Sequence, residues 1–109
     1  MSNPSDARTT ETAALEARLF QIAAAGQTIP YGALARDLGW RMATLTAALE
    51  ALMEADSAAQ RPLRASLCEG KLSRGQPALG FFEKAAALGY DISDPEAFVA
   101  AERAALFGA

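Results

Sequence analysis

The residue types that carry most enzyme chemistry are nearly absent from this chain. It has no histidine and a single cysteine, Cys68. The chain therefore lacks the usual general base, the commonest metal ligand and the side chain that changes charge near neutral pH. One cysteine is also too few ligands for a structural zinc site. We expect no metal and no cofactor, and we predict that the protein is not an enzyme.

Two local patterns bear on catalysis, and both fall short of the chemistry they would need. Residues 65–72 come close to a phosphate-binding loop, but that loop requires glycine in place of Ala65 and serine or threonine in place of Leu72. Carboxylates also occur at close spacing, as Glu50 with Glu54 and as Asp91 with Asp94. The first pair fits a solvated helix face and the second fits a helix start, so neither indicates an acid–base pair.

Charge is distributed unevenly along the 109 residues, which carry a formal net charge of −3. Residues 1–60 hold four basic and seven acidic side chains, and residues 85–109 hold one basic and four acidic ones. Residues 61–84 instead hold five basic side chains against two acidic ones. A basic segment in an acidic chain is typical of a phosphate-binding surface, and it equally suits an ordinary solvated hairpin.

The length suits a single domain, which we place at residues 10–109 after a flexible N-terminal tail at residues 1–9. No stretch approaches the roughly 20 apolar residues of a membrane span, and the polar start does not resemble a secretory signal. We therefore expect a cytoplasmic protein that binds no membrane. A first helix is predicted from about residue 10 to 25, because Leu15, Leu19 and Ile22 share one helical face.

The centre of the chain predicts a helix-turn-helix over about residues 30–58. Pro30 suits the first turn of a short helix, and Gly39 suits its end. A longer helix follows, with an inward face of regularly spaced apolar residues: Met42, Leu45, Leu49, Leu52 and Met53. Alternation over residues 63–68 predicts a strand, the turn formers after it predict a hairpin or wing over about 62–81, and two helices are expected over about 82–107.

A family resemblance enters at residues 28–39, which read TIPYGALARDLG. This segment resembles the winged-helix domain of alkylguanine-DNA alkyltransferases and alkyltransferase-like proteins, and also small bacterial winged-helix proteins of unassigned role. The resemblance extends over about residues 28–89 and implies a winged helix-turn-helix with DNA-binding ability. The reactive cysteine of the alkyltransferases lies in Pro-Cys-His-Arg, whereas Cys68 is followed by Glu69, so no alkyl transfer is expected here.

The expected fold class is thus α+β, mostly helical: a winged helix-turn-helix with additional C-terminal helices. Its leading function would be non-catalytic binding of double-stranded DNA, in a regulatory or accessory role such as transcription regulation. The wing and the start of the third helix would make most contacts, through Arg41, Thr44, Arg61, Arg64, Lys71 and Arg74. The outward face of that helix otherwise lacks the side chains that read bases, and its far end is acidic.

That acidic face favours a second hypothesis of another class, a protein-interaction or dimerisation module that binds no nucleic acid. Trp40, Phe81 and Phe82 are its candidate contact residues, with the alternative that Trp40 closes the helix turn and the last helix covers the phenylalanines. The first and last helices are rich in alanine, which permits close approach, so a homodimer through them is also a hypothesis.

Overall fold

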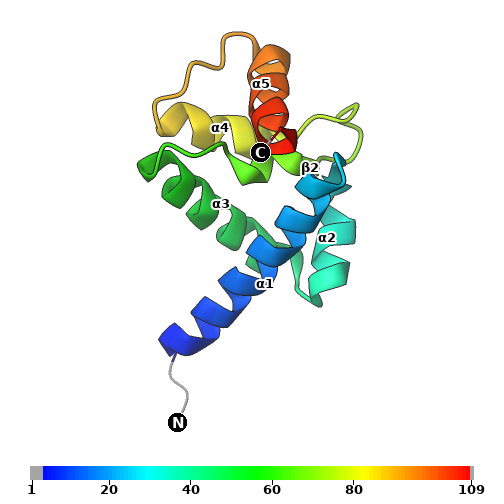
Figure 1. Ribbon diagram of the computed structural model, residues 1–109, viewed down its shortest axis with the longest axis vertical. Coiled ribbons are helices and arrows are strands. Elements are labelled where there is room, and N and C mark those ends of the chain that lie inside the picture. The colour runs from blue at the N-terminus through cyan, green and yellow to red at the C-terminus, as the bar shows by residue number, and fades with distance from the viewer. Residues whose placement is uncertain (1–3, 109) are drawn as a thin grey trace.

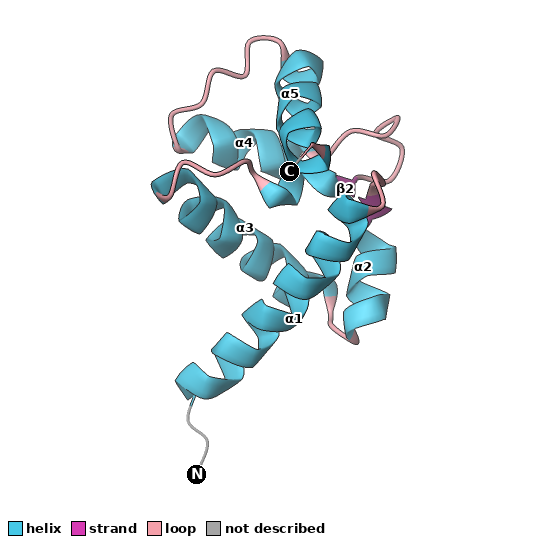
Figure 2. Ribbon diagram, viewed as in Figure 1, coloured by secondary structure: helices cyan, strands magenta, loops and turns pink. Residues whose placement is uncertain are grey.

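The computed structural model describes the backbone of residues 4–108 and the side chains of residues 10–108. This part of the chain is mostly helical, with one small parallel sheet, in agreement with the expected α+β class (Figures 1 and 2). In chain order the elements are α1 (Pro4–Ala24), β1 (Ile29–Pro30), α2 (Tyr31–Leu38), α3 (Met42–Ala58), the 3-10 helix η1 (Arg64–Leu67), β2 (Cys68–Glu69), α4 (Leu79–Ala87) and α5 (Pro95–Phe107).

Helix α1 is longer than the sequence predicted. It begins at Pro4 rather than near Thr10, so most of the expected tail at residues 1–9 is helical, and residues 1–3 lie outside the described residues. Leu15, Leu19 and Ile22 are buried, as expected. Figure 1 shows that the N-terminal half of this helix extends away from the other elements.

The helix pair expected over residues 30–58 is present as α2 and α3. Gly39 ends α2 in the left-handed conformation (φ 71°), and the Trp40 N–H donates back to the Ala35 carbonyl at 2.9 Å, which closes the turn. The apolar stripe of α3 is buried at Leu45, Leu49, Leu52 and Met53. Met42, which was expected to face inward, is 47% exposed because it begins the helix at the edge of a pocket.

The described residues contain no antiparallel hairpin, so the wing expected over residues 62–81 is wrong as a β-structure and the winged-helix assignment is not confirmed. Residues 64–67 form η1, and the two-residue strand β2 pairs in parallel with β1, Ile29 with Cys68 and Pro30 with Glu69. The last residues of the expected wing, 79–81, are instead the start of α4.

The reason lies in how residues 63–68 are covered. Leu63 and the four residues from Ala65 to Cys68 are buried, because the segment lies between α3 and α5 rather than along an open edge. The Arg103 side chain, from α5, donates to the Ser66 carbonyl at 2.7 Å and to the Cys68 carbonyl at 3.4 Å. These bonds satisfy carbonyls that a hairpin would have paired with a neighbouring strand.

The C-terminal helices follow their sequence signals. The Asp94 side chain accepts a hydrogen bond from the Ala97 N–H at 3.2 Å, with Pro95 as the first helical residue of α5. Phe98 of α5 then packs on Phe81 of α4, with ring centroids 6.1 Å apart. This contact and the buried Val99 fix α5 against the rest of the core.

A buried carboxylate joins three elements at the centre of the fold. Asp56, in the last turns of α3, is fully buried and accepts hydrogen bonds from the backbone N–H and the guanidinium of Arg64 and from the guanidinium of Arg61. Arg64 also donates to Glu16 of α1 at 2.8 Å. Burial alone would lower the pKa of the Arg64 guanidinium, but its hydrogen bonds with both carboxylates raise it above its ordinary value.

We predict that Asp56→Asn lowers the free energy of unfolding by about 3–5 kcal/mol, because it removes the buried counter-charge of the largely buried Arg64 guanidinium. Urea denaturation followed by Trp40 fluorescence measures this change. Asp37→Asn is the matched control: its ion pair with Arg18 is partly exposed at both side chains, so its loss costs less than about 1 kcal/mol. Equal effects of the two substitutions would contradict the role assigned to Asp56.

Candidate functional site: an apolar pocket beside a basic loop

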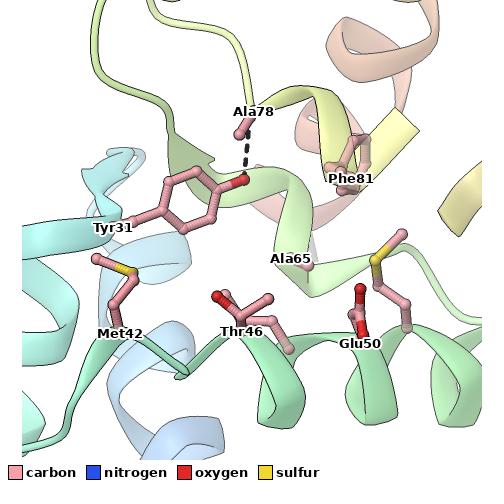
Figure 3. Close-up of a pocket in the computed structure, with 10 residues that line it drawn as sticks. Tyr31, Met42, Thr46, Glu50, Ala65, Ala78 and Phe81 are labelled. Atoms are coloured by element: carbon pink, nitrogen blue, oxygen red, sulfur yellow. Dashed lines mark hydrogen bonds between the residues drawn. The ribbon is translucent and has the colours of Figure 1, made fainter. Parts of the chain in front are cut away.

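An apolar pocket of about 260 Å³ opens between α3 and the start of α4 (Figure 3). Figure 3 shows Met42, Thr46 and Glu50 following one another along α3, with Tyr31 and Phe81 across from them. Its walls are formed by Tyr31, Met42, Thr46, Leu49, Glu50, Met53, Ala65, Ala78, Gly80 and Phe81. Cavities of about 150 Å³ lined by apolar side chains hold benzene, so this pocket has room for an aliphatic or aromatic side chain.

The wall formed by Tyr31 is held in place by the loop that follows β2. The Tyr31 hydroxyl accepts a hydrogen bond from the Ala78 N–H at 3.1 Å, which joins the first residue of α2 to the residue before α4. Burial raises the pKa of Tyr31 to about 12, so the phenol is neutral at physiological pH. The wall therefore presents an uncharged ring to the pocket.

The rim of the pocket combines an exposed apolar side chain with one free carboxylate. Met42 lines the pocket and is 47% exposed. Glu50 is exposed and forms no ion pair among the described residues. Apolar surface of this kind beside a single negative charge suits an apolar group that carries a cation nearby.

Sequence reasoning missed this pocket, because it draws on segments that are distant in the chain. The signals that it could have used were weak: Phe81 was considered only as one of a pair of phenylalanines, and Glu50 was assigned to a solvated face. Only the packing of α4 across α3 brings these side chains to one cavity.

Two of the six side chains expected to bind DNA are instead structural. Arg64 is held by Asp56 and Glu16, with its side chain only 20% exposed, and Arg61 is paired with Asp56 at 3.2 Å. Pairing with a buried carboxylate competes with contact to a phosphate, most strongly at Arg64. Arg61 keeps 53% of its side chain exposed, so the pairing restricts it less.

A third expected contact, Thr44, is also poorly placed for DNA. It is half-buried and lines a groove between α3 and the Glu11–Thr12 part of α1. The exposed face of α3 consists mainly of small or acidic side chains, namely Ala43, Ala47, Glu50, Ala51, Glu54 and Ala55. This face carries no Arg, Lys, Asn or Gln for base edges, its exposed hydroxyl is that of Thr46, and the unpaired Glu50 would repel phosphates.

The other three expected contacts are exposed and unpaired. Arg41, Lys71 and Arg74, together with Arg36, form no ion pair among the described side chains. Arg36 and Arg41 flank the turn between α2 and α3, whereas Lys71 and Arg74 lie in the loop between β2 and α4. Figure 1 shows this turn and this loop on the same side of the molecule as α2.

The loop of residues 70–76, which we call the basic loop, is closed on itself. The Gly70 N–H donates to the Gln76 carbonyl at 2.8 Å, and the Ser73 N–H donates to the Gly70 carbonyl at 3.2 Å. A Cβ at Gly70 would lie 2.6 Å from the Ser73 Oγ and 3.2 Å from the Ala78 backbone, so the closure requires glycine there. Its tip presents Lys71, Leu72 and Arg74 to solvent.

The aromatic residues proposed as partner contacts are largely absorbed by the fold. Phe81 is buried against Phe98 and against Phe82, whose ring packs on it edge-on at 5.2 Å, so it is not an exposed contact surface, although it also lines the apolar pocket. Phe82 and Trp40 are partly buried and pack on the core. The placement of Trp40 at the closed α2–α3 turn agrees with the interpretation that it secures this turn.

We predict that the protein loses stability from about pH 9 upward. Burial raises the pKa of Cys68 and that of Tyr31 to about 12, from ordinary values of 9 and 10. The unfolded chain releases these protons at lower pH than the folded chain, so the free energy of unfolding falls as pH rises between 9 and 12. Urea unfolding at pH 8, 9.5 and 10.5 measures the decline, and in Cys68→Ala it should begin about one unit higher. A flat profile in the wild type would contradict the prediction.

The described residues contain no cluster of metal-ligating side chains and no helix long and apolar enough to cross a membrane. Comparisons with protein-family models, with curated proteins and with solved structures found no significant match. Three surface features remain to support a function: the apolar pocket, the basic loop and the unpaired arginines at the α2–α3 turn.

Proposed function

We propose that this protein is a non-catalytic protein-interaction module, whose apolar pocket binds an apolar side chain that has a basic residue next to it. The observation that supports this proposal most directly is the pocket itself, an apolar cavity with a single unpaired carboxylate, Glu50, at its edge. Met42, which lines the cavity and is partly exposed, extends the apolar surface toward solvent. Exposed apolar surface of this kind is stabilised when a partner covers it.

Each wall of the pocket determines a separate property of the ligands that it can bind. The methionine side chains of Met42 and Met53 are flexible and polarisable, so they adapt to apolar groups of different shape. Phe81 and Tyr31 are held by packing and by the Ala78 hydrogen bond, so they give the cavity fixed sides. Glu50 selects for a positive charge, since a ligand with an acidic flank would be repelled.

A tripeptide with leucine between two lysines, acetyl-Lys-Leu-Lys-amide, tests the pocket. We predict binding with a dissociation constant on the order of a millimolar, seen as ¹H–¹⁵N chemical-shift changes at Thr46, Glu50, Gly80 and Phe81. Glu50→Lys should weaken binding at least about threefold, because it replaces attraction by repulsion. Glu83→Lys, at an exposed position of α4 outside the pocket, should leave it unchanged.

The same titration with acetyl-Glu-Leu-Glu-amide decides the role of charge. The acidic peptide should bind more weakly than the basic one in the wild type, and the order should reverse in Glu50→Lys. Shift changes confined to other surfaces, or equal binding of both peptides, would overturn the proposal.

Binding of double-stranded DNA is the second candidate, and four unpaired basic side chains carried by α2, the α2–α3 turn and the basic loop favour it: Arg36, Arg41, Lys71 and Arg74. Gly32 and Gly39, at the two ends of the exposed face of α2, add no side chain that would obstruct a phosphate backbone. The acidic exposed face of α3 excludes deep insertion of that helix. Contacts would therefore be made to phosphates, with little sequence selectivity.

Fluorescence anisotropy with a random-sequence duplex tests this candidate. If four cations contact phosphates, affinity should fall about a hundredfold between 50 and 200 mM salt. Affinity should also fall in Arg36→Ala/Arg41→Ala and in Lys71→Ala/Arg74→Ala. The control Arg18→Ala/Lys84→Ala removes the same charge from side chains already paired with Asp37 and Glu54, so it should bind like the wild type. Absence of binding at low salt would exclude this candidate.

A further inference from the structure

The tip of the basic loop carries the most exposed large apolar side chain among the described residues. Leu72 is 95% exposed, and its backbone lies in the left-handed region (φ 62°), which a leucine rarely adopts. Arg74 and Gly75 also have positive φ, at 52° and 83°. The hydrogen bonds that close the loop therefore hold Leu72 away from the core of its own chain.

The chemistry of this tip is the complement of the pocket. Leu72 is an apolar side chain, and Lys71 and Arg74 beside it are exposed and unpaired cations. The pocket is apolar, and its edge carries the unpaired carboxylate of Glu50. The chain thus presents both a site for an apolar group beside a cation and a loop of that composition.

We infer that a second copy of this chain is a partner of the module: Leu72 of each copy enters the apolar pocket of the other, with Lys71 and Arg74 facing Glu50 of the receiving copy. The inference rests on the proposed function of the pocket and adds the identity of an occupant. It differs from a dimer through the alanine-rich helices, because α1 and α5 take no part in the contact.

The position of the loop relative to the pocket allows two copies to bind each other reciprocally in a closed dimer. Ala78, which follows the loop, lines the pocket, and its N–H donates to the hydroxyl of Tyr31, another lining residue. The C-terminal end of the loop therefore adjoins the pocket. A two-fold axis close to this junction places each loop at the other copy's pocket, which gives a closed dimer with two identical contacts rather than an open chain of molecules.

Sedimentation equilibrium of the free protein over a wide concentration range tests the inference. The wild type should form dimers. Leu72→Asn should raise the dimer dissociation constant by about a hundredfold or more, because each dimer loses two buried leucines. Asparagine adopts the left-handed conformation readily, so the loop keeps its shape. Glu50→Lys and Lys71→Glu/Arg74→Glu should each weaken the dimer at least about tenfold, through like charges at both contacts.

Mixing the two charge variants gives the most specific result. In a heterodimer of Glu50→Lys with Lys71→Glu/Arg74→Glu, one contact has the wild-type charges and the other has both charges reversed. The mixture should therefore regain an affinity near that of the wild type, although each variant alone is largely monomeric. Failure of the mixture to dimerise would overturn the reciprocal contact.

Two controls distinguish this dimer from one formed through α1 and from a monomer that binds only peptides. Phe20→Ser, on α1, removes another highly exposed apolar side chain, 75% exposed, and should leave the dimer intact. A dimer lost in Phe20→Ser but kept in Leu72→Asn would place the contact on α1 and overturn the inference. A wild type that stays monomeric while the pocket binds acetyl-Lys-Leu-Lys-amide would overturn the inference and leave the proposed function standing. A wild type that neither dimerises nor binds the peptide would overturn both the inference and the proposed function.

Discussion

The buried carboxylate of Asp56 is the interaction on which the arrangement of this protein depends. A carboxylate with no solvent contact is stable only when donors surround it, and Arg64 supplies them from its backbone and its guanidinium. Arg64 begins η1 and also binds Glu16. It therefore fixes the end of α3, the start of η1 and the middle of α1 relative to one another. The course of β2, the basic loop and α4 follows from that position.

This network also decides which charges are left for binding. The basic segment of residues 61–84 is the most positive part of the chain, yet Arg61 and Arg64 neutralise Asp56 and Lys84 neutralises Glu54. Of the five basic side chains in that segment, only Lys71 and Arg74 form no ion pair. The binding capacity of the segment is therefore concentrated at the tip of the loop, where Leu72 also lies.

Local signals in the sequence were enough to place most of the helices. Gly39, the stripe from Leu45 to Met53 and the pair Asp94–Pro95 act within a few residues, and the structure has the helix boundaries that they indicate. The exposure of Lys71 and Arg74 was predictable for the same reason, since turn-forming residues around them keep the backbone at the surface.

The alternation in residues 63–68 wrongly predicted a strand, because alternating apolar and polar residues do not by themselves specify one. A strand also needs a partner with free backbone groups, and the nearest candidate was taken by α4. One signal in the sequence could have shown that Arg61 and Arg64 pair with a buried carboxylate. Asp56 falls four residues after Leu52, on the same stripe as Leu45 and Leu49, so the helical period itself places it inside. A carboxylate at an inner position requires basic partners, and Arg61 and Arg64 are the next ones along the chain.

The two candidate functions make competing demands on one loop. Lys71 and Arg74 cannot face Glu50 of a second copy and a phosphate backbone at the same time. If both events occur, each opposes the other by the same free energy, since linkage between two binding equilibria is reciprocal. The geometry favours the protein contact, because burial of the exposed Leu72 side chain in an apolar pocket is favourable. Contact with phosphates would not bury that side chain. Nucleic acid would be held by the loop only through its two charges, with Arg36 and Arg41 as the remaining contacts.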